Sequence, residues 1–121
     1  MKVLASDQVP FESRKYGRKV KRIFDEEIDN TSCVIYLSML EGQLDYHYHK
    51  SSHEIIIFPE GGCLEVNGKL HQFGPYGAVL LEPGDVHGLS ASEAQKQTHI
   101  AIKIPRDNDK VESCPSCEKK L

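Results

Sequence analysis

The sequence contains no tryptophan, few other aromatic residues and no long apolar segment. Aromatic side chains make up 7% of its 121 residues. No apolar run approaches the roughly 20 residues that a membrane-spanning helix needs. No sustained apolar region follows the first residues of the chain, so the sequence predicts no secretion signal. These absences predict a soluble, cytoplasmic protein with no membrane partner.

The chain also lacks a strong excess of charge of either sign. Its 15 Lys and Arg residues against 18 Asp and Glu residues give a formal net charge of -3. The one basic run, residues 15–22, lies close to the acidic residues 25–27, which is typical of a solvated surface. Binding to nucleic acid is therefore not expected, because such a surface needs a clustered basic excess.

Cysteine is scarce, with 4 residues in the chain. Cys33 and Cys63 lie in strand-like sequence, and Cys114 and Cys117 form a Cys-x-x-Cys pair near the C-terminus. Without a secretion signal, reduced thiols are expected rather than a disulfide framework. Because two thiolates are half of a tetrahedral zinc site, the Cys114/Cys117 pair is open to two interpretations. It is either part of a second metal site, completed by the other two cysteines or by a second subunit, or a pair of free thiols.

The length of the chain and its turn residues predict one domain built of short strands. A chain of 121 residues with 39% hydrophobic content has room for one modest core. We expect residues 1–18 to form an N-terminal arm, residues 19–105 the domain and residues 106–121 a C-terminal tail. Within the domain, apolar runs separated by turn residues predict strands at 20–24, 33–40, 45–48, 54–58, 63–66, 69–73, 78–81 and 98–104.

Turn signals favour an all-β fold. Asn67-Gly68 separates two of the predicted strands and is a strong signal for a two-residue hairpin, because a type I′ turn needs positive φ at both central positions. Signals for helices are nearly absent. Many short strands punctuated by glycine and proline indicate a sandwich or a barrel.

Three histidines and one glutamate have the spacing of a mononuclear metal site. His47 and His49 are two residues apart, so on a strand both imidazoles point to the same face. Glu54 begins the next apolar run, after a turn, and would face the two histidines. His87 follows the turn-forming segment 83–86. This mixture of imidazoles and one carboxylate suits Fe(II), Mn, Ni, Co or Zn.

The same residues carry a resemblance to the two sequence motifs of the cupin superfamily. The matching sequence is Gly42-x4-His47-x-His49-x4-Glu54-x6-Gly61, followed by Gly77 and Pro83-Gly84-Asp85-Val86-His87. The resemblance covers residues 42–87. It implies a small single-domain jelly-roll barrel, the double-stranded β-helix, with one divalent transition metal held by His47, His49, Glu54 and His87. Departures from the motifs at the Gly42–His47 spacing, Glu82 and Ala91 remove none of the ligands.

The superfamily includes dioxygenases, isomerases, lyases and binding proteins, so the resemblance leaves the function open. The leading hypothesis is a dioxygenase-type oxidoreductase, with Fe(II) favoured, acting on a small carboxylate, enol or phenol. The alternatives are a metal-dependent lyase or isomerase, and a ligand-binding or sensor protein without turnover. Candidates for proton transfer are Tyr36, Tyr76 and His53. Lys103 and Arg106 are candidates for receiving a substrate carboxylate.

Two features depend on which face of each strand is inner. His99 alternates with Ala101 and Lys103, whereas isoleucines at 100, 102 and 104 take the other face. His99 is therefore buried only if its own face is the inner one. Facing away from the metal, the side chains at 46, 48, 55 and 57 form an apolar surface that a second sheet or another subunit must cover. A homodimer is expected.

Overall fold

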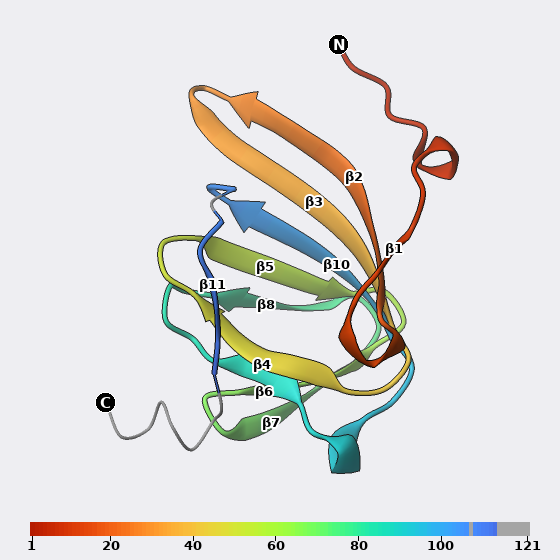
Figure 1. The fold of residues 1–121 in the computed structure, drawn as a ribbon, viewed down its shortest axis with the longest axis vertical. Coiled ribbons are helices and arrows are strands. Elements are labelled where there is room, and N and C mark those ends of the chain that lie inside the picture. Colours follow the sequence, from red (N-terminus) through yellow and green to blue (C-terminus); the bar gives the residue numbers. More distant parts are fainter. Residues whose placement is uncertain (107, 114–121) are drawn as a thin grey trace.

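The structure, a computed structural model, describes residues 1–106 and 108–113 as two facing antiparallel sheets (Figure 1). One sheet has the strand order β1-β2-β3-β10-β5-β8, and the other has the order β11-β4-β9-β6-β7. The strands are β1 (Glu12–Ser13), β2 (Lys19–Ile28), β3 (Thr31–Leu40), β4 (Leu44–His49), β5 (His53–Phe58), β6 (Gly62–Val66), β7 (Lys69–Phe73), β8 (Gly77–Leu81), β9 (His87–Leu89), β10 (Gln97–Ile104) and β11 (Lys110–Glu112). This architecture confirms the predicted all-β jelly-roll fold.

Every predicted strand is present, and the hairpin at Asn67-Gly68 is confirmed. The backbone φ angles of these two residues are 49° and 83°, and Val66 pairs with Lys69 across the turn. Helical structure in the described residues consists of short 3-10 turns, namely η1 (Ser6–Gln8), η2 (Lys15–Gly17) and η3 (Ala91–Glu93). No helix in this part of the chain is long and apolar enough to cross a membrane.

Strands β1, β9 and β11 were not predicted, because two or three residues are too few to show a period. Strand β11 lies in the segment expected to be a tail, where it pairs with β4 so that Lys110 is opposite His49 and Glu112 is opposite His47. Strand β1 pairs with the start of β2. The β structure therefore extends beyond residues 19–105 at both ends.

The inner faces of the two sheets enclose an apolar core and, beside it, a polar cluster. Alternation along β5 points Glu54, Ile56 and Phe58 inward. The Phe58 ring stacks on Phe73 with the ring centroids 4.2 Å apart. The other buried members of the core are Leu40, Leu44, Cys63, Leu64, Leu81, Leu89 and Ala101. Because apolar packing fills the Phe58 end of β5, the polar side chains gather at its Glu54 end.

Candidate metal centre

The structure brings the four predicted metal ligands together. His47 and His49 come from β4, Glu54 from β5 and His87 from β9, and all four side chains are buried. Their ligand atoms lie within 4.8 Å of one another. His47 and His87 are directly opposite each other in the antiparallel pair of β4 and β9. Residues from three strands thus converge on one point between the sheets.

Backbone carbonyls fix the orientation of two of the imidazoles. Nδ1 of His47 lies 2.8 Å from the carbonyl oxygen of Asp45, and Nδ1 of His87 lies 3.0 Å from that of Asp85. Since a carbonyl oxygen only accepts a hydrogen bond, Nδ1 must carry the proton on both rings. In the neutral form of each ring, the lone pair is therefore on Nε2, the atom that would bind a metal ion.

A carboxylate orients the third imidazole. Nδ1 of His49 donates to Oδ1 of Asp109 at 3.2 Å, and Lys103 Nζ lies 2.8 Å from the same oxygen. The other carboxylate oxygen accepts hydrogen bonds from the amides of Ser51 and Ser52. Burial opposes ionisation of Asp109, but Lys103 and the two amides outweigh it and hold the pKa of this carboxyl below its usual range. Asp109 is therefore the charged partner of a metal ligand.

Two residues of the cluster, His47 and Glu54, have pKa values that favour cation binding. Burial, aided by the neighbouring His87, lowers the pKa of His47 to about 3, so this imidazole is neutral near pH 7. Burial opposes ionisation of Glu54, but His49 and His87 outweigh it and hold the pKa of the carboxyl below its usual range. Neutral imidazoles beside one carboxylate bind a metal without first losing protons.

Unpartnered atoms in the cluster are further evidence for a metal ion. Nε2 of His49 and Oε1 of Glu54 are buried and have no hydrogen-bond partner among the residues that the structure describes. That carboxylate oxygen lies 3.6 Å from Nε2 of His49 and 3.2 Å from Nε2 of His87. Leaving such atoms buried without a partner is costly, and one divalent cation would serve all of them. The residues fit the metal that was predicted, and the donor set is compatible with several first-row metals.

A cavity of about 310 Å³ opens onto this cluster. Its wall includes three of the ligands, His47, His49 and Glu54, and the predicted candidates Tyr36 and Lys103. The rest of its lining is Arg14, Arg18, Val20, Ser38, Ala101, Asn108 and Lys110. A small molecule in this cavity would contact the metal ligands on one side and cationic or hydroxyl side chains on the other.

The other two candidates for proton transfer lie away from the cavity. Tyr76 is 78% exposed and lies between β7 and β8, where its φ angle of 62° belongs to a turn. His53 is exposed and lies opposite Ile104, on the outer face of β5. The strand alternation that points Glu54 inward points His53 outward. Tyr36, on the inner face of β3, is the only one of the three predicted candidates that lines the cavity.

The structure also decides the positions of His99 and Arg106. His99 is 3% exposed, so the face that it shares with Ala101 and Lys103 is the inner one. It lines a smaller cavity of about 40 Å³, together with the metal ligands His47, Glu54 and His87. Arg106 pairs with Asp25 at 3.2 Å and does not line the cavity at the metal cluster.

The predictions for the cysteines have different outcomes. Cys33 and Cys63 are free and buried, as expected for reduced thiols. Cys114 and Cys117 lie outside the described residues, so the second metal site stays a prediction.

Several residues of the site were not identified from the sequence. Ser38 lies two residues after Tyr36 in a predicted strand, so strand alternation puts both side chains on one face. This alternation was the only sequence signal for Ser38. Arg18, Asn108 and Asp109 belong to the segments expected to be arm and tail. They reach the cluster through tertiary contacts that leave no periodic pattern in the sequence.

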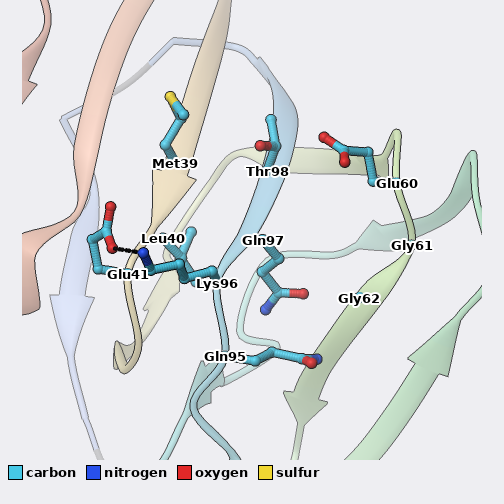
Figure 2. Close-up of a pocket in the computed structure, with 10 residues that line it drawn as sticks. All are labelled: Met39, Leu40, Glu41, Glu60, Gly61, Gly62, Gln95, Lys96, Gln97 and Thr98. Carbon is cyan, nitrogen blue, oxygen red and sulfur yellow. Dashed lines mark ion pairs between the residues drawn. The ribbon is translucent and has the colours of Figure 1, made fainter.

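A second cavity, of about 350 Å³, lies at the other end of β10 (Figure 2). Gln97 and Thr98 at the start of this strand line it, whereas Lys103 near the end of the strand lines the cavity at the metal cluster. The Gln97 amide is fully engaged with the backbone of Cys63, accepting from its N–H at 2.8 Å and donating to its carbonyl at 2.9 Å. This cavity contains none of the four ligands, so the chemistry is expected at the first one.

No protein-family model and no curated protein matches the sequence. Solved structures do match. The polyketide cyclase RemF from Streptomyces resistomycificus has a TM-score of 0.73 at 18% identity, over 94% of this chain and 86% of RemF. The Streptomyces nucleoside dehydratase Pac13 has a TM-score of 0.72 at 11% identity, over 96% of each chain.

An RmlC-like cupin from Shewanella frigidimarina is also similar, with a TM-score of 0.66 at 16% identity over 86% of this chain and 90% of that one. At such identities, the similarity establishes a shared fold and does not establish a shared reaction.

Proposed function

The chain has the cupin fold, and from this premise we propose that it is a metal-dependent enzyme that moves a proton on a small, oxygen-rich acid, as a lyase or isomerase does. The observation that carries the proposal is the cavity of about 310 Å³ whose wall joins His47, His49 and Glu54 to cationic and hydroxyl side chains. Such a lining favours an anionic substrate over a neutral apolar one.

The four ligands would hold one divalent transition metal. When bound, this ion would act as a Lewis acid on a substrate oxygen and so acidify the neighbouring C–H or O–H bond. Asp109 would hold the His49 ring in its ligating orientation, and the carbonyls of Asp45 and Asp85 would do the same for the other two rings.

Tyr36 is the residue that we propose to move the proton. It lies on the inner face of β3 and lines the cavity with Ser38 and the ligands. The Arg22 guanidinium lies over its ring, 5.6 Å from the centroid, in a weak cation–π contact. A phenol hydroxyl in this position both donates and accepts a hydrogen bond, as a general acid or base must.

Dioxygenase chemistry is the second candidate. It is supported by the donor set of three imidazoles and one carboxylate, which suits Fe(II) and leaves positions open on the ion. The polar cavity wall and the named activities of the similar structures, a cyclase and a dehydratase, favour proton transfer without oxygen. A binding protein without turnover is the third possibility, and it is excluded by any conversion of substrate.

Metal analysis and proton exchange test the proposal together. We expect about one divalent ion per chain in freshly purified protein that carries no histidine tag, and loss of this ion in His87→Ala. The metal-loaded protein is then incubated anaerobically in D₂O with a panel of hydroxy and keto acids, and proton NMR follows the replacement of substrate C–H by deuterium. Tyr36→Phe should slow the exchange at least about tenfold, while Tyr76→Phe, at an exposed position, is the matched control.

Other outcomes would contradict the proposal. Oxygen uptake equal to substrate consumption, with no anaerobic exchange, would establish the dioxygenase instead. A protein that holds no metal and regains none when metal is added would overturn both reactions. A ligand that raises the thermal unfolding midpoint but is never converted would indicate a binding protein without turnover.

A further inference from the structure

One guanidinium in the cavity at the metal cluster has no counter-ion among the described residues. Four cationic side chains line this cavity: Arg14, Arg18, Lys103 and Lys110. Three of them pair with a carboxylate, at distances of 2.6 Å (Arg14–Glu12), 2.8 Å (Lys103–Asp109) and 2.9 Å (Lys110–Asp45). In the part of the chain that the structure describes, no carboxylate lies within ion-pair distance of Arg18.

Arg18 is half-buried and bonded to a neutral group. Its Nη1 donates to the hydroxyl of Ser38 at 3.4 Å. Burial lowers the pKa of Arg18, against the longer-range attraction of Asp45 and Glu54. A partly desolvated cation whose bond is to a hydroxyl is unfavourable in the free protein, because the lost hydration is not replaced. An anionic ligand group would replace it.

The position of Arg18 links the open cavity to the metal cluster. Arg18 and Ser38 line the cavity of about 310 Å³ and also the smaller one of about 40 Å³. Glu54 and His47 line both cavities as well, and His87 lines the smaller one. A ligand with one oxygen directed at the cluster therefore has Arg18 within reach of its other end.

We propose that Arg18 and Ser38 form a carboxylate subsite, and that the substrate is a small monocarboxylic acid whose second oxygen, a hydroxyl or carbonyl, is directed at the metal cluster. This inference rests on the proposed function and names its substrate class. A guanidinium matches a carboxylate through two parallel N–H···O bonds. The guanidinium supplies one positive charge for one carboxylate, and the ion at the cluster would supply the positive charge that the second oxygen meets. The cavity volume, near the lower end for small-molecule sites, limits the acid to a small one.

Salicylate and salicylamide are suitable probes, because they share a phenol oxygen and differ in that salicylate alone carries a carboxylate. Calorimetric titration of the Mn(II)-loaded protein should show salicylate binding at least about tenfold more tightly than salicylamide. Arg18→Gln should weaken salicylate binding by about tenfold to a hundredfold and abolish the preference. Ser38→Ala should cause a smaller loss, and Arg18→Lys should keep part of the preference.

Arg106→Gln is the matched control, because Arg106 is paired with Asp25 and does not line this cavity. It should leave the preference for salicylate unchanged. The Mn(II) stoichiometry and the thermal unfolding midpoint of Arg18→Gln should equal those of the unmodified protein, which separates lost binding from lost folding. Equal binding of salicylate by Arg18→Gln and the unmodified protein would overturn the subsite, as would equal binding of the two probes by the unmodified protein.

The same titrations distinguish failure of the subsite from failure of the proposed function. If metal retention depends on His87 but salicylate is not preferred over salicylamide, the proposed subsite is wrong and the proposed metal-dependent function is not contradicted. If the protein retains no metal but still prefers salicylate in a way that depends on Arg18, the proposed function is wrong and the subsite is supported.

Discussion

Asp109 Oδ1 lies 3.2 Å from Nδ1 of His49, so a residue of the C-terminal segment orients a predicted metal ligand 60 positions earlier in the chain. The carboxylate makes the imidazole a stronger ligand because it attracts the Nδ1 proton and leaves more electron density on Nε2. The same carboxylate accepts hydrogen bonds from the amides of Ser51 and Ser52, just before β5. Asp109 thus connects ligand basicity to the turn between β4 and β5.

We expect Asp109→Asn to lower metal affinity by about tenfold to a hundredfold. The amide keeps an oxygen for the serine amides but lacks the charge that polarises His49. Competition of the protein with a chromophoric chelator for Mn(II) or Zn(II) measures the affinity. Glu112→Gln, which removes an exposed carboxylate in nearby β11, is the control and should have no effect. Unchanged affinity in Asp109→Asn would refute this role for the carboxylate.

The stability of the metal-free protein should depend on pH through His99. Burial, with a smaller effect of Arg18, lowers the pKa of this imidazole from 6.5 to about 4. At pH values between these two pKa values, His99 binds a proton in the unfolded chain but not in the folded protein. The free energy of unfolding therefore falls as the pH falls. The expected contribution of His99 is a slope of about 1.4 kcal/mol per pH unit.

Urea unfolding at pH 7, 6 and 5 measures this slope. The slope should be shallower in His99→Gln by about the contribution of one group. It should not vanish, because His47 has a pKa of about 3 and contributes in the same direction. His71→Gln, at an exposed position, should leave the slope unaltered. Identical slopes in His99→Gln and the unmodified protein would show that His99 takes up its proton in the folded state.

Gly62→Ala should be strongly destabilising. A Cβ atom at this position would lie 1.9 Å from Oε1 of Gln97, whose amide makes two hydrogen bonds with the backbone of Cys63. Displacing this amide loses buried hydrogen bonds and adds overpacking, at a cost of about 2–4 kcal/mol. Gly74→Ala is the control, because nothing lies within 4 Å of its added Cβ. Equal urea midpoints for the two variants would contradict this expectation.

The single apolar surface expected from residues 46, 48, 55 and 57 is divided in the structure, because β4 and β5 belong to different sheets. A homodimer stays a prediction, now from the outer face of the six-stranded sheet. Ile55 lies opposite Ile102, and Ile57 opposite Ile100, so aliphatic side chains of neighbouring strands form a continuous surface beside the 55% exposed Leu80. Apolar surfaces of this kind are commonly covered by another subunit. Sedimentation velocity should show a dimer for the unmodified protein and a shift to monomer for Leu80→Lys. The control is Tyr76→Lys, in an exposed turn, and a monomeric unmodified protein at all concentrations would exclude the dimer.

Three of the predicted ligands could be brought together by local rules, whereas His87 was placed with them through the cupin resemblance. Strand alternation pairs His47 with His49, and the apolar run after a turn places Glu54 opposite them. The hairpin at residues 67–68 follows from backbone sterics that few residues other than Asn and Gly satisfy. These signals lie within a few residues of the feature that they predict, so one sequence is enough to find them.

The supporting residues were not predictable in the same way. Arg18 and Asp109 reach the site from opposite ends of the chain, and no period or spacing connects either to the ligands. The direction of Tyr76 depends on a positive φ angle that this residue type seldom adopts, so strand alternation gave no guide to it. Information of this kind is contained in the packing of whole sheets, which becomes visible only when their strand order is known.

The pairing of β11 with β4 has a consequence for biosynthesis. A chain emerging from a ribosome exposes its four ligands well before the segment that carries Asp109. Until that segment has emerged, His49 has no carboxylate to hold its ring, and the sheet that contains β4 lacks its edge strand. A nascent chain that lacks Asp109 would therefore hold the predicted ion less tightly than the folded protein, and would exchange it more readily.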